Sequence, residues 1–328
     1  MGRTEGSLRD LWSLVRHVRW ARPTPGIRRR AVEYLAVFER VVVPVVTAAV
    51  DDPVVRERVV DALRGPGVKL TFLAAAYAET AGLPLDVEPT VLTGAITRVY
   101  DDLFDHFGGP DLDNRLDSLF RTGDFAAAND VEAVFAGLYR AVRERVDPAA
   151  LELLLGELLE LQAYQVRSRE QTDPSVGFSS VLDITRGKGG HGMVVLFGVA
   201  TGPLHWRESA LVRELGSVLQ LLDDYEDMEP DRAAGVRTAV TLGGISLGGI
   251  CAGLREVADG FGARFGRRRP MFTIVYAALW MSYLRRRFPR PGGRSPVARH
   301  PLSTLLLHPA PLASPDLRLS PRPARGKV

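Results

Sequence analysis

Two short acidic clusters, each at the end of an apolar run, place the tightest limit on how this chain can fold. The first cluster contributes Asp101, Asp102 and Asp105, and the second contributes Asp223, Asp224 and Asp227. On a helix, the first and last aspartates of each cluster lie one turn apart on the same face, where like charges repel and weaken the helix. Divalent cations relieve this repulsion. The pattern therefore predicts two helices whose acidic faces meet around bound metal ions.

Acidic runs on helices are more often solvent-exposed faces than metal sites, and this is the alternative explanation of both clusters. A solvated face usually interleaves Lys or Arg with the acidic residues, but positions 223–229 contain neither. Both clusters are also embedded in Leu, Val, Ile and Phe. Mg²⁺ suits such a site, because it accepts one or two carboxylates per ion and completes its shell with water and substrate phosphate. We therefore favour a magnesium clamp for a diphosphate.

Helical patterns recur along the chain, with glycine and proline breakers between them. Positions 41–50 are rich in β-branched residues, but Pro44 and the lack of partner strands argue against a sheet. The Arg-Gly-Pro-Gly run at 64–67 is expected to end a helix. The sequence thus predicts an all-α protein with an N-terminal segment over 1–26, one helical domain over 27–288 and a disordered Pro- and Arg-rich tail over 289–328.

Composition excludes several classes of protein. The 328 residues carry a net charge of only +3, which gives no case for nucleic-acid binding. A single cysteine, Cys251, excludes an internal disulfide and fits a reducing cytoplasm. No apolar stretch is long enough to span a bilayer, so a cytoplasmic protein without a membrane span is expected.

The acidic clusters resemble the two metal-binding motifs of class I isoprenoid synthases. Positions 215–227 read Leu-Gly-Ser-Val-Leu-Gln-Leu-Leu-Asp-Asp-Tyr-Glu-Asp, similar to the second motif of the trans-prenyl diphosphate synthase branch. Lys-Gly-Gly at 188–190, with Leu-Gln-Ala-Tyr-Gln at 161–165, resembles bacterial terpene cyclases of the tetraprenyl-β-curcumene synthase type. The resemblance covers about residues 30–288.

The resemblance implies a single-domain helical bundle around a deep apolar cavity, with the six aspartates at its mouth. It also implies three Mg²⁺ ions and a linear prenyl diphosphate as substrate, and it leaves a homodimer open as the assembly. Substrate-binding candidates come from the same alignment of motifs and from helical spacing. They are Lys188, Arg169, Gln165, Gln220 and Arg237 for the diphosphate end, and Tyr276, Trp280 and Tyr283 for the carbocation.

The three aromatic residues fall on one helical face, where ring faces stabilise a cation by about 0.5–2 kcal/mol each. An aromatic stripe at this spacing is more often plain core. Among the basic candidates Lys188 is preferred, because it stands between glycines that would let the backbone approach a phosphate.

The small number of basic residues on either side of the first acidic cluster indicates the type of reaction. A chain-elongating synthase needs a second diphosphate site, formed by a Gly-Lys-Arg type segment before the first motif and an Arg pair after it. Here those regions offer only Lys69 and Arg115. We therefore expect a class I terpene synthase that ionises and cyclises one prenyl diphosphate and releases diphosphate. The alternatives are a trans-prenyl diphosphate synthase and a non-catalytic homologue that serves as a binding subunit.

The residues just before the first motif bear on the length of the substrate. Thr97 and Ile96, four and five positions before Asp101, form no bulky aromatic floor, which allows a substrate of 20 carbons or longer.

Overall fold

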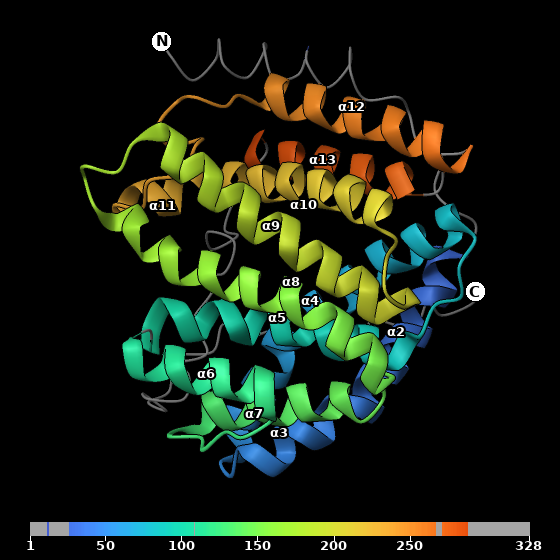
Figure 1. The fold of residues 1–328 in the computed structure, drawn as a ribbon, viewed down its shortest axis with the longest axis vertical. Coiled ribbons are helices and arrows are strands. Elements are labelled where there is room, and N and C mark those ends of the chain that lie inside the picture. Colours follow the sequence, from blue (N-terminus) through green and yellow to red (C-terminus); the bar gives the residue numbers. More distant parts are fainter. Residues whose placement is uncertain (1–11, 13–25, 108, 267–270, 288–328) are drawn as a thin grey trace, which may run out of the picture.

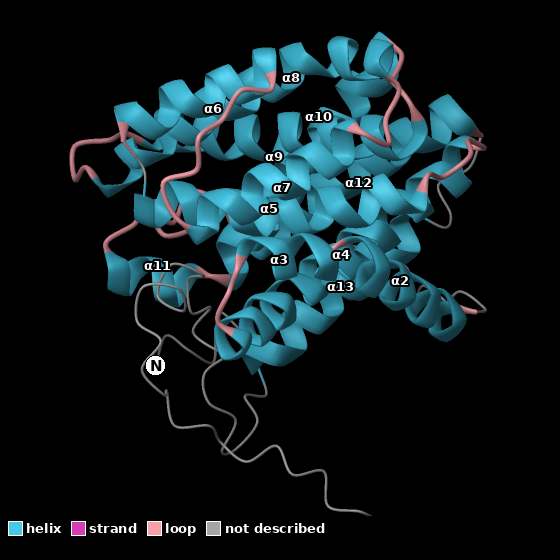
Figure 2. Cartoon of the chain, turned by 90° about the horizontal axis from the view of Figure 1, so that it is seen from below, coloured by secondary structure: helices cyan, strands magenta, loops and turns pink. Residues whose placement is uncertain are grey.

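The computed structural model describes residue 12 and residues 26–107, 109–266 and 271–287. Every regular element in these ranges is helical, as Figure 2 shows, so the predicted all-α fold is confirmed for the described residues. The predicted tail over 289–328 lies outside them, as does the predicted N-terminal segment apart from positions 12 and 26. None of the described helices is long and apolar enough to cross a lipid bilayer.

The helices, in chain order, are α2 (Ile27–Val41), α3 (Val43–Ala49), α4 (Pro53–Ala81), α5 (Val87–Phe107), α6 (Pro110–Thr122), α7 (Asp130–Arg143), α8 (Pro148–Arg167), the 3₁₀ helix η1 (Ser168–Thr172), α9 (Phe178–Thr201), α10 (Trp206–Glu226), α11 (Met228–Ala234), α12 (Leu247–Phe265) and α13 (Met271–Arg287). Figure 1 shows α9 running obliquely between α10 and α8, and α9 packs against both.

Two clusters of buried apolar side chains hold the bundle together. One gathers side chains from α2, α3, α5, α6 and α7, with Phe38, Leu103 and Phe135 at its centre. The other gathers side chains from α10, α12 and α13 around Phe197 and Phe261. Helices α4 and α9 contribute residues to both clusters. Each fully buried side chain of this size stabilises the fold by about 1.5–3 kcal/mol. The two shared helices therefore link the two clusters.

The predicted helix end at 64–67 is wrong, because α4 continues through Pro66. A proline inside a helix removes one backbone hydrogen bond and crowds the preceding turn. Pro66 lies where α4 crosses α5, with a glycine on each helix at the contact: a Cβ on Gly94 would lie 3.0 Å from the Gly67 carbonyl oxygen. This close contact with α5, together with burial of Gly67 against Phe38, keeps the helix in place on both sides of the proline.

The β-branched region at 41–50 forms the end of α2 and the short helix α3, as Pro44 predicted. Pro44 occupies the first turn of α3, where a missing N–H costs nothing because that donor has no partner within the helix.

Glycines also bring α9 and α10 unusually close. A Cβ on Gly216 would lie 2.1 Å from the Gly189 carbonyl oxygen, and a Cβ on Gly189 would lie 2.3 Å from the Gly216 carbonyl oxygen. On the other face of α9, Gly187 leaves room for the Tyr164 ring of α8. The glycines around Lys188 thus lie inside a helix and serve helix packing, which differs from the phosphate-approaching backbone expected of them.

Candidate functional site

The first acidic cluster lies at the C-terminal end of α5, and its aspartates have different surroundings. Asp101 is exposed and accepts a hydrogen bond of 2.9 Å from the Gln165 side chain of α8. Asp102 is only 3% exposed. The side chain of Asp105 is not among those described. Asp101 and Gln165 are therefore brought together as the sequence predicted for one site, while Asp102 points into the bundle.

Asp102 forms a two-pronged ion pair with Arg98, one helical turn earlier on α5. The Arg98 Nη2 and Nε atoms lie 3.0 and 3.1 Å from its two carboxylate oxygens. A buried carboxylate needs such a partner, because burial without one is costly. Sequence reasoning missed Arg98, although its spacing of four residues from Asp102 is the signal that finds ion pairs on a helix. Arg98 already neutralises Asp102, a role that the sequence had given to metal.

The second cluster lies at the C-terminal end of α10, where Asp224 is buried and Asp223 and Asp227 are half-buried. Asp224 is 9% exposed and accepts a hydrogen bond of 3.0 Å from the Thr185 hydroxyl of α9. Burial, together with the charge of Asp223 beside it, raises the pKa of Asp224 to about 7, against the lowering effects of Thr185 and Lys188. Asp223 lies 3.4 Å from the Gln220 side-chain nitrogen. Asp227 occupies the junction of α10 and α11.

These side chains suit a hard divalent cation in donor type. A buried carboxylate whose pKa is raised by burial and by a neighbouring carboxylate, as Asp224 is, is stabilised when a cation replaces the proton. Within the described ranges, no three Asp, Glu, His or Cys side chains converge as a complete protein-only metal site would. Mg²⁺ does not need such a site, since it accepts one or two carboxylates and takes the rest of its shell from water and phosphate. The second cluster therefore fits Mg²⁺, and in the first cluster the ion pair with Arg98 leaves Asp101 as the better-suited carboxylate of the two described.

Lys188 lies on α9 three residues after Thr185, on the side of the helix that interacts with the second cluster. Its positive charge acts on the buried Asp224 carboxylate. Because α9 and α10 touch backbone to backbone at Gly189 and Gly216, the position of Lys188 relative to the acidic cluster is fixed by packing. The Lys188 ammonium group is therefore held where its positive charge acts on the second acidic cluster.

The other two basic candidates are engaged in structural contacts. Arg169 of η1 binds both carboxylate oxygens of Asp113 at 2.6 and 2.7 Å and lies 5.2 Å from the Phe104 ring centroid. The backbone of Arg237 exchanges hydrogen bonds with Gln171. Each arginine keeps one buried Nε that has no hydrogen-bond partner among the described residues.

The aromatic candidates all lie on α13, against or within the second apolar cluster. Tyr283 is 6% exposed, and its ring is perpendicular to that of Trp280 at 6.2 Å. Tyr276 packs against Phe272. The predicted cavity beside them stays a prediction. A hollow of about 290 Å³ that the described residues do form lies elsewhere, between α6 and α7, and is lined by Leu119, Gly123, Tyr139, Arg140, Arg143 and Glu144.

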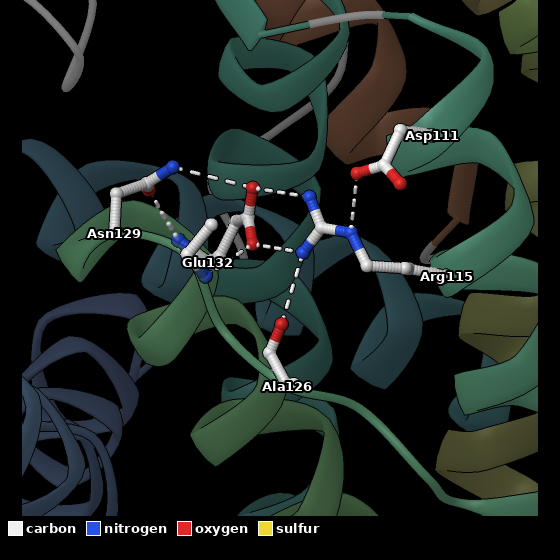
Figure 3. Close-up of polar contacts among 6 residues, drawn as sticks. Asp111, Arg115, Ala126, Asn129 and Glu132 are labelled. Atoms are coloured by element: carbon white, nitrogen blue, oxygen red, sulfur yellow. Dashed lines mark hydrogen bonds and ion pairs between the residues drawn. The ribbon is translucent and has the colours of Figure 1, made fainter.

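Arg115 lies at the centre of a polar network between α6 and α7, which Figure 3 shows. Its guanidinium group binds both carboxylate oxygens of Glu132 and donates to Asp111 at 2.9 Å and to the Ala126 carbonyl oxygen at 3.0 Å. It also lies 5.4 Å from the Phe125 ring centroid. Arg115 thus has protein partners on every side, and a second diphosphate would have to displace them.

We expect Glu132→Gln to lower the free energy of unfolding by about 2–3 kcal/mol, because it leaves Arg115 without its main partner. Burial alone would raise the pKa of Glu132, but hydrogen bonds from Arg115, from the Ala128 N–H and from Asn129 outweigh it, so the pKa is lowered from 4.5. A lowered native-state pKa stabilises the fold above the unfolded-state value, and the effect is lost as the pH falls through the native value. Denaturation by urea should therefore show a constant difference from wild type near neutral pH, shrinking in acid.

Glu144→Gln is the matched control for this prediction, because Glu144 is exposed at the C-terminal end of α7. We expect it to change the stability by less than about 0.5 kcal/mol. Equal stabilities for the Glu132 and Glu144 variants would contradict a structural role for the Arg115 network.

The chain is similar to a geranyltransferase from Legionella pneumophila, with 15% sequence identity, a TM-score of 0.47, and coverage of 87% of this chain and 99% of that chain. No family model and no curated protein sequence matches.

Proposed function

We propose that the protein is a class I terpene synthase that ionises and cyclises a linear prenyl diphosphate of 20 or more carbons and releases diphosphate. The observation that carries this proposal is the acidic end of α10, where Asp224 is buried beside Asp223 with Lys188 acting on it from α9. Buried like charges weaken a fold. A cluster of this kind is readily understood where its task is to bind cations and an anionic substrate.

The proposal assigns the metal ligands to the ends of two helices. Asp223, Asp224 and Asp227 hold Mg²⁺ from the α10 side. Asp101 and Asp105 hold it from the α5 side, with Asp102 joining only on release from Arg98. Three bound Mg²⁺ ions would supply the positive charge that stabilises diphosphate as it leaves.

The remaining residues of the site bind and orient. Lys188 contacts the diphosphate as a point charge. Gln165 orients Asp101, and Gln220 orients Asp223, through the hydrogen bonds described above. The aromatic face of α13, formed by Tyr276, Trp280 and Tyr283, is the proposed wall for the carbocation. Apolar packing around the site keeps water from the reactive chain.

A one-substrate reaction is supported by the basic residues around the first motif. A second diphosphate would need cations of its own, and Arg115 is bound by Glu132, Asp111 and Ala126 instead. Lys69 is exposed on α4 and follows Gly67, which packs against Phe38. With Arg115 occupied, little positive charge is left to hold isopentenyl diphosphate.

The test supplies the purified protein with Mg²⁺ and a ladder of prenyl diphosphates, from geranyl through geranylgeranyl to longer chains, with and without radiolabelled isopentenyl diphosphate. We expect release of inorganic diphosphate and a hydrocarbon or alcohol from the allylic substrate alone, and no label in a longer product. Label in a longer water-soluble diphosphate would overturn the cyclase and establish a chain-elongating synthase. Diphosphate release from none of the substrates would overturn the enzyme and favour a binding subunit.

A further inference from the structure

The 3₁₀ helix η1 contacts the segments that follow both acidic clusters. On one side, Arg169 binds Asp113 of α6 with two parallel hydrogen bonds and stacks on Phe104, the residue before Asp105. Just before η1, the Gln162 side chain of α8 donates to the Asp113 carbonyl oxygen at 2.8 Å. The side chain and the backbone of Asp113, on the helix that follows the first cluster, are therefore both held from the α8–η1 side.

On the other side, Gln171 holds the segment after the second cluster. The Arg237 N–H donates to the Gln171 carbonyl oxygen at 2.8 Å, and the Gln171 side chain donates to the Arg237 carbonyl oxygen at 3.0 Å. Gln171 is 8% exposed, so water competes little for these bonds.

Backbone hydrogen bonds continue from this contact to the second cluster. The N–H of Val236, next to Arg237, donates to the Asp231 carbonyl oxygen at 2.8 Å. The Asp231 N–H donates to the Asp227 carbonyl oxygen at 2.9 Å, and the Asp227 N–H donates to the Asp223 carbonyl oxygen at 2.9 Å. A displacement at Gln171 is therefore passed along bonded backbone to the acidic end of α10.

We infer that η1 is a tie that sets the separation of the two acidic clusters, and that Arg169 and Gln171 are positioning residues within it. Arg169 acts on the first cluster through Asp113 and Phe104, and Gln171 acts on the second through Arg237. The inference rests on the proposed function for its effect on turnover, but the tie itself is a mechanical property of the protein. It also gives Arg169 a role other than the diphosphate contact that the sequence suggested.

Hydrogen–deuterium exchange on the full chain, without substrate or metal, tests the tie directly. We expect Arg169→Gln to speed amide exchange over 111–116, and Gln171→Met to speed it over 236–242, each by at least about fivefold. Helix α2 should be unaffected. Arg121→Gln is the matched control, because Arg121 pairs with Asp117 on the exposed face of α6, and it should leave both regions unchanged. Unchanged exchange in both test variants would overturn the tie.

Kinetics then test what the tie does. We expect the Mg²⁺ concentration for half-maximal diphosphate release to rise by at least about fivefold in each of Arg169→Gln, Asp113→Asn and Gln171→Met. The KM for the prenyl diphosphate, measured at saturating Mg²⁺, should change by less than about twofold. The Arg169→Gln and Asp113→Asn double variant should be no worse than the worse single variant, because the two residues act as a unit. If Arg169→Gln raised the KM for the prenyl diphosphate while Asp113→Asn left it at the wild-type value, Arg169 would be a direct substrate ligand and its positioning role would be overturned.

The two arms separate the two ideas. Absence of turnover by the wild-type protein would defeat the proposed function, and the exchange measurement would still decide whether the tie exists. Should Arg169→Gln fail to fold, Arg169→Lys takes its place, since lysine keeps the charge and loses the fork that matches the carboxylate.

Discussion

Asp223→Ala and Asp101→Ala are each expected to lower the rate of diphosphate release by about 10²–10³-fold or more, while the helix content stays unchanged. Both residues lie at the C-terminal ends of helices, at α10 and α5, and neither belongs to an apolar cluster. Each substitution removes a carboxylate that is a proposed metal ligand, and it relieves like-charge repulsion with the neighbouring aspartates. Circular dichroism should therefore show native helicity, and a coupled diphosphate assay should show the loss.

A chelator should reproduce this loss in the wild-type protein, and added Mg²⁺ should restore activity. Asp117→Ala is the matched control, because Asp117 is a half-exposed aspartate that pairs with Arg121 on α6. It should retain wild-type turnover. If Asp223→Ala or Asp101→Ala kept near-normal product formation, the metal-site assignment of that cluster would be wrong.

Local signals in the sequence were enough to predict the helical class, and residues of the same local kind cap two helices. Asn129 precedes α7 and its side chain accepts from the Glu132 N–H, and Asp147 caps α8 in the same way. Such caps depend on residues only two or three positions apart, so they can be read directly from the sequence. The helical period of the apolar residues is equally local.

Features that depend on distant parts of the chain could not be predicted in this way. Proline and glycine at 65–67 are breakers by local rules, but the contact between Gly67 and Gly94 across two helices overrides them. The glycines around Lys188 read as a phosphate-binding backbone, whereas Gly216, far along the chain, explains them as a helix crossing. Arg169 was assigned to the site, but no local pattern reveals that Asp113 is its partner.

The close crossing of α9 and α10 leads to the largest stability effect that we expect. Gly216→Ala places a Cβ about 2.1 Å from the Gly189 carbonyl oxygen and 2.7 Å from Met193 Cβ. A backbone oxygen inside a helix cannot move aside as a flexible side chain can, so the two helices must separate. We expect a loss of about 3 kcal/mol in unfolding free energy and a fall of about 6–12 °C in Tm, measured by calorimetry.

The same substitution should reduce activity by more than the loss of folded protein explains. The Thr185 hydroxyl of α9 donates a hydrogen bond to Asp224 of α10, and the charge of Lys188 acts on the same carboxylate. Separation of the helices moves both residues away from Asp224. Gly156→Ala provides the opposite control: Gly156 lies inside α8 with open space where its Cβ would be. Alanine there should raise stability by about 0.5–1 kcal/mol, because it restricts the unfolded chain and favours the helix. If both alanine variants behaved alike, the backbone contact of α9 with α10 would not be what positions Lys188 over the acidic cluster.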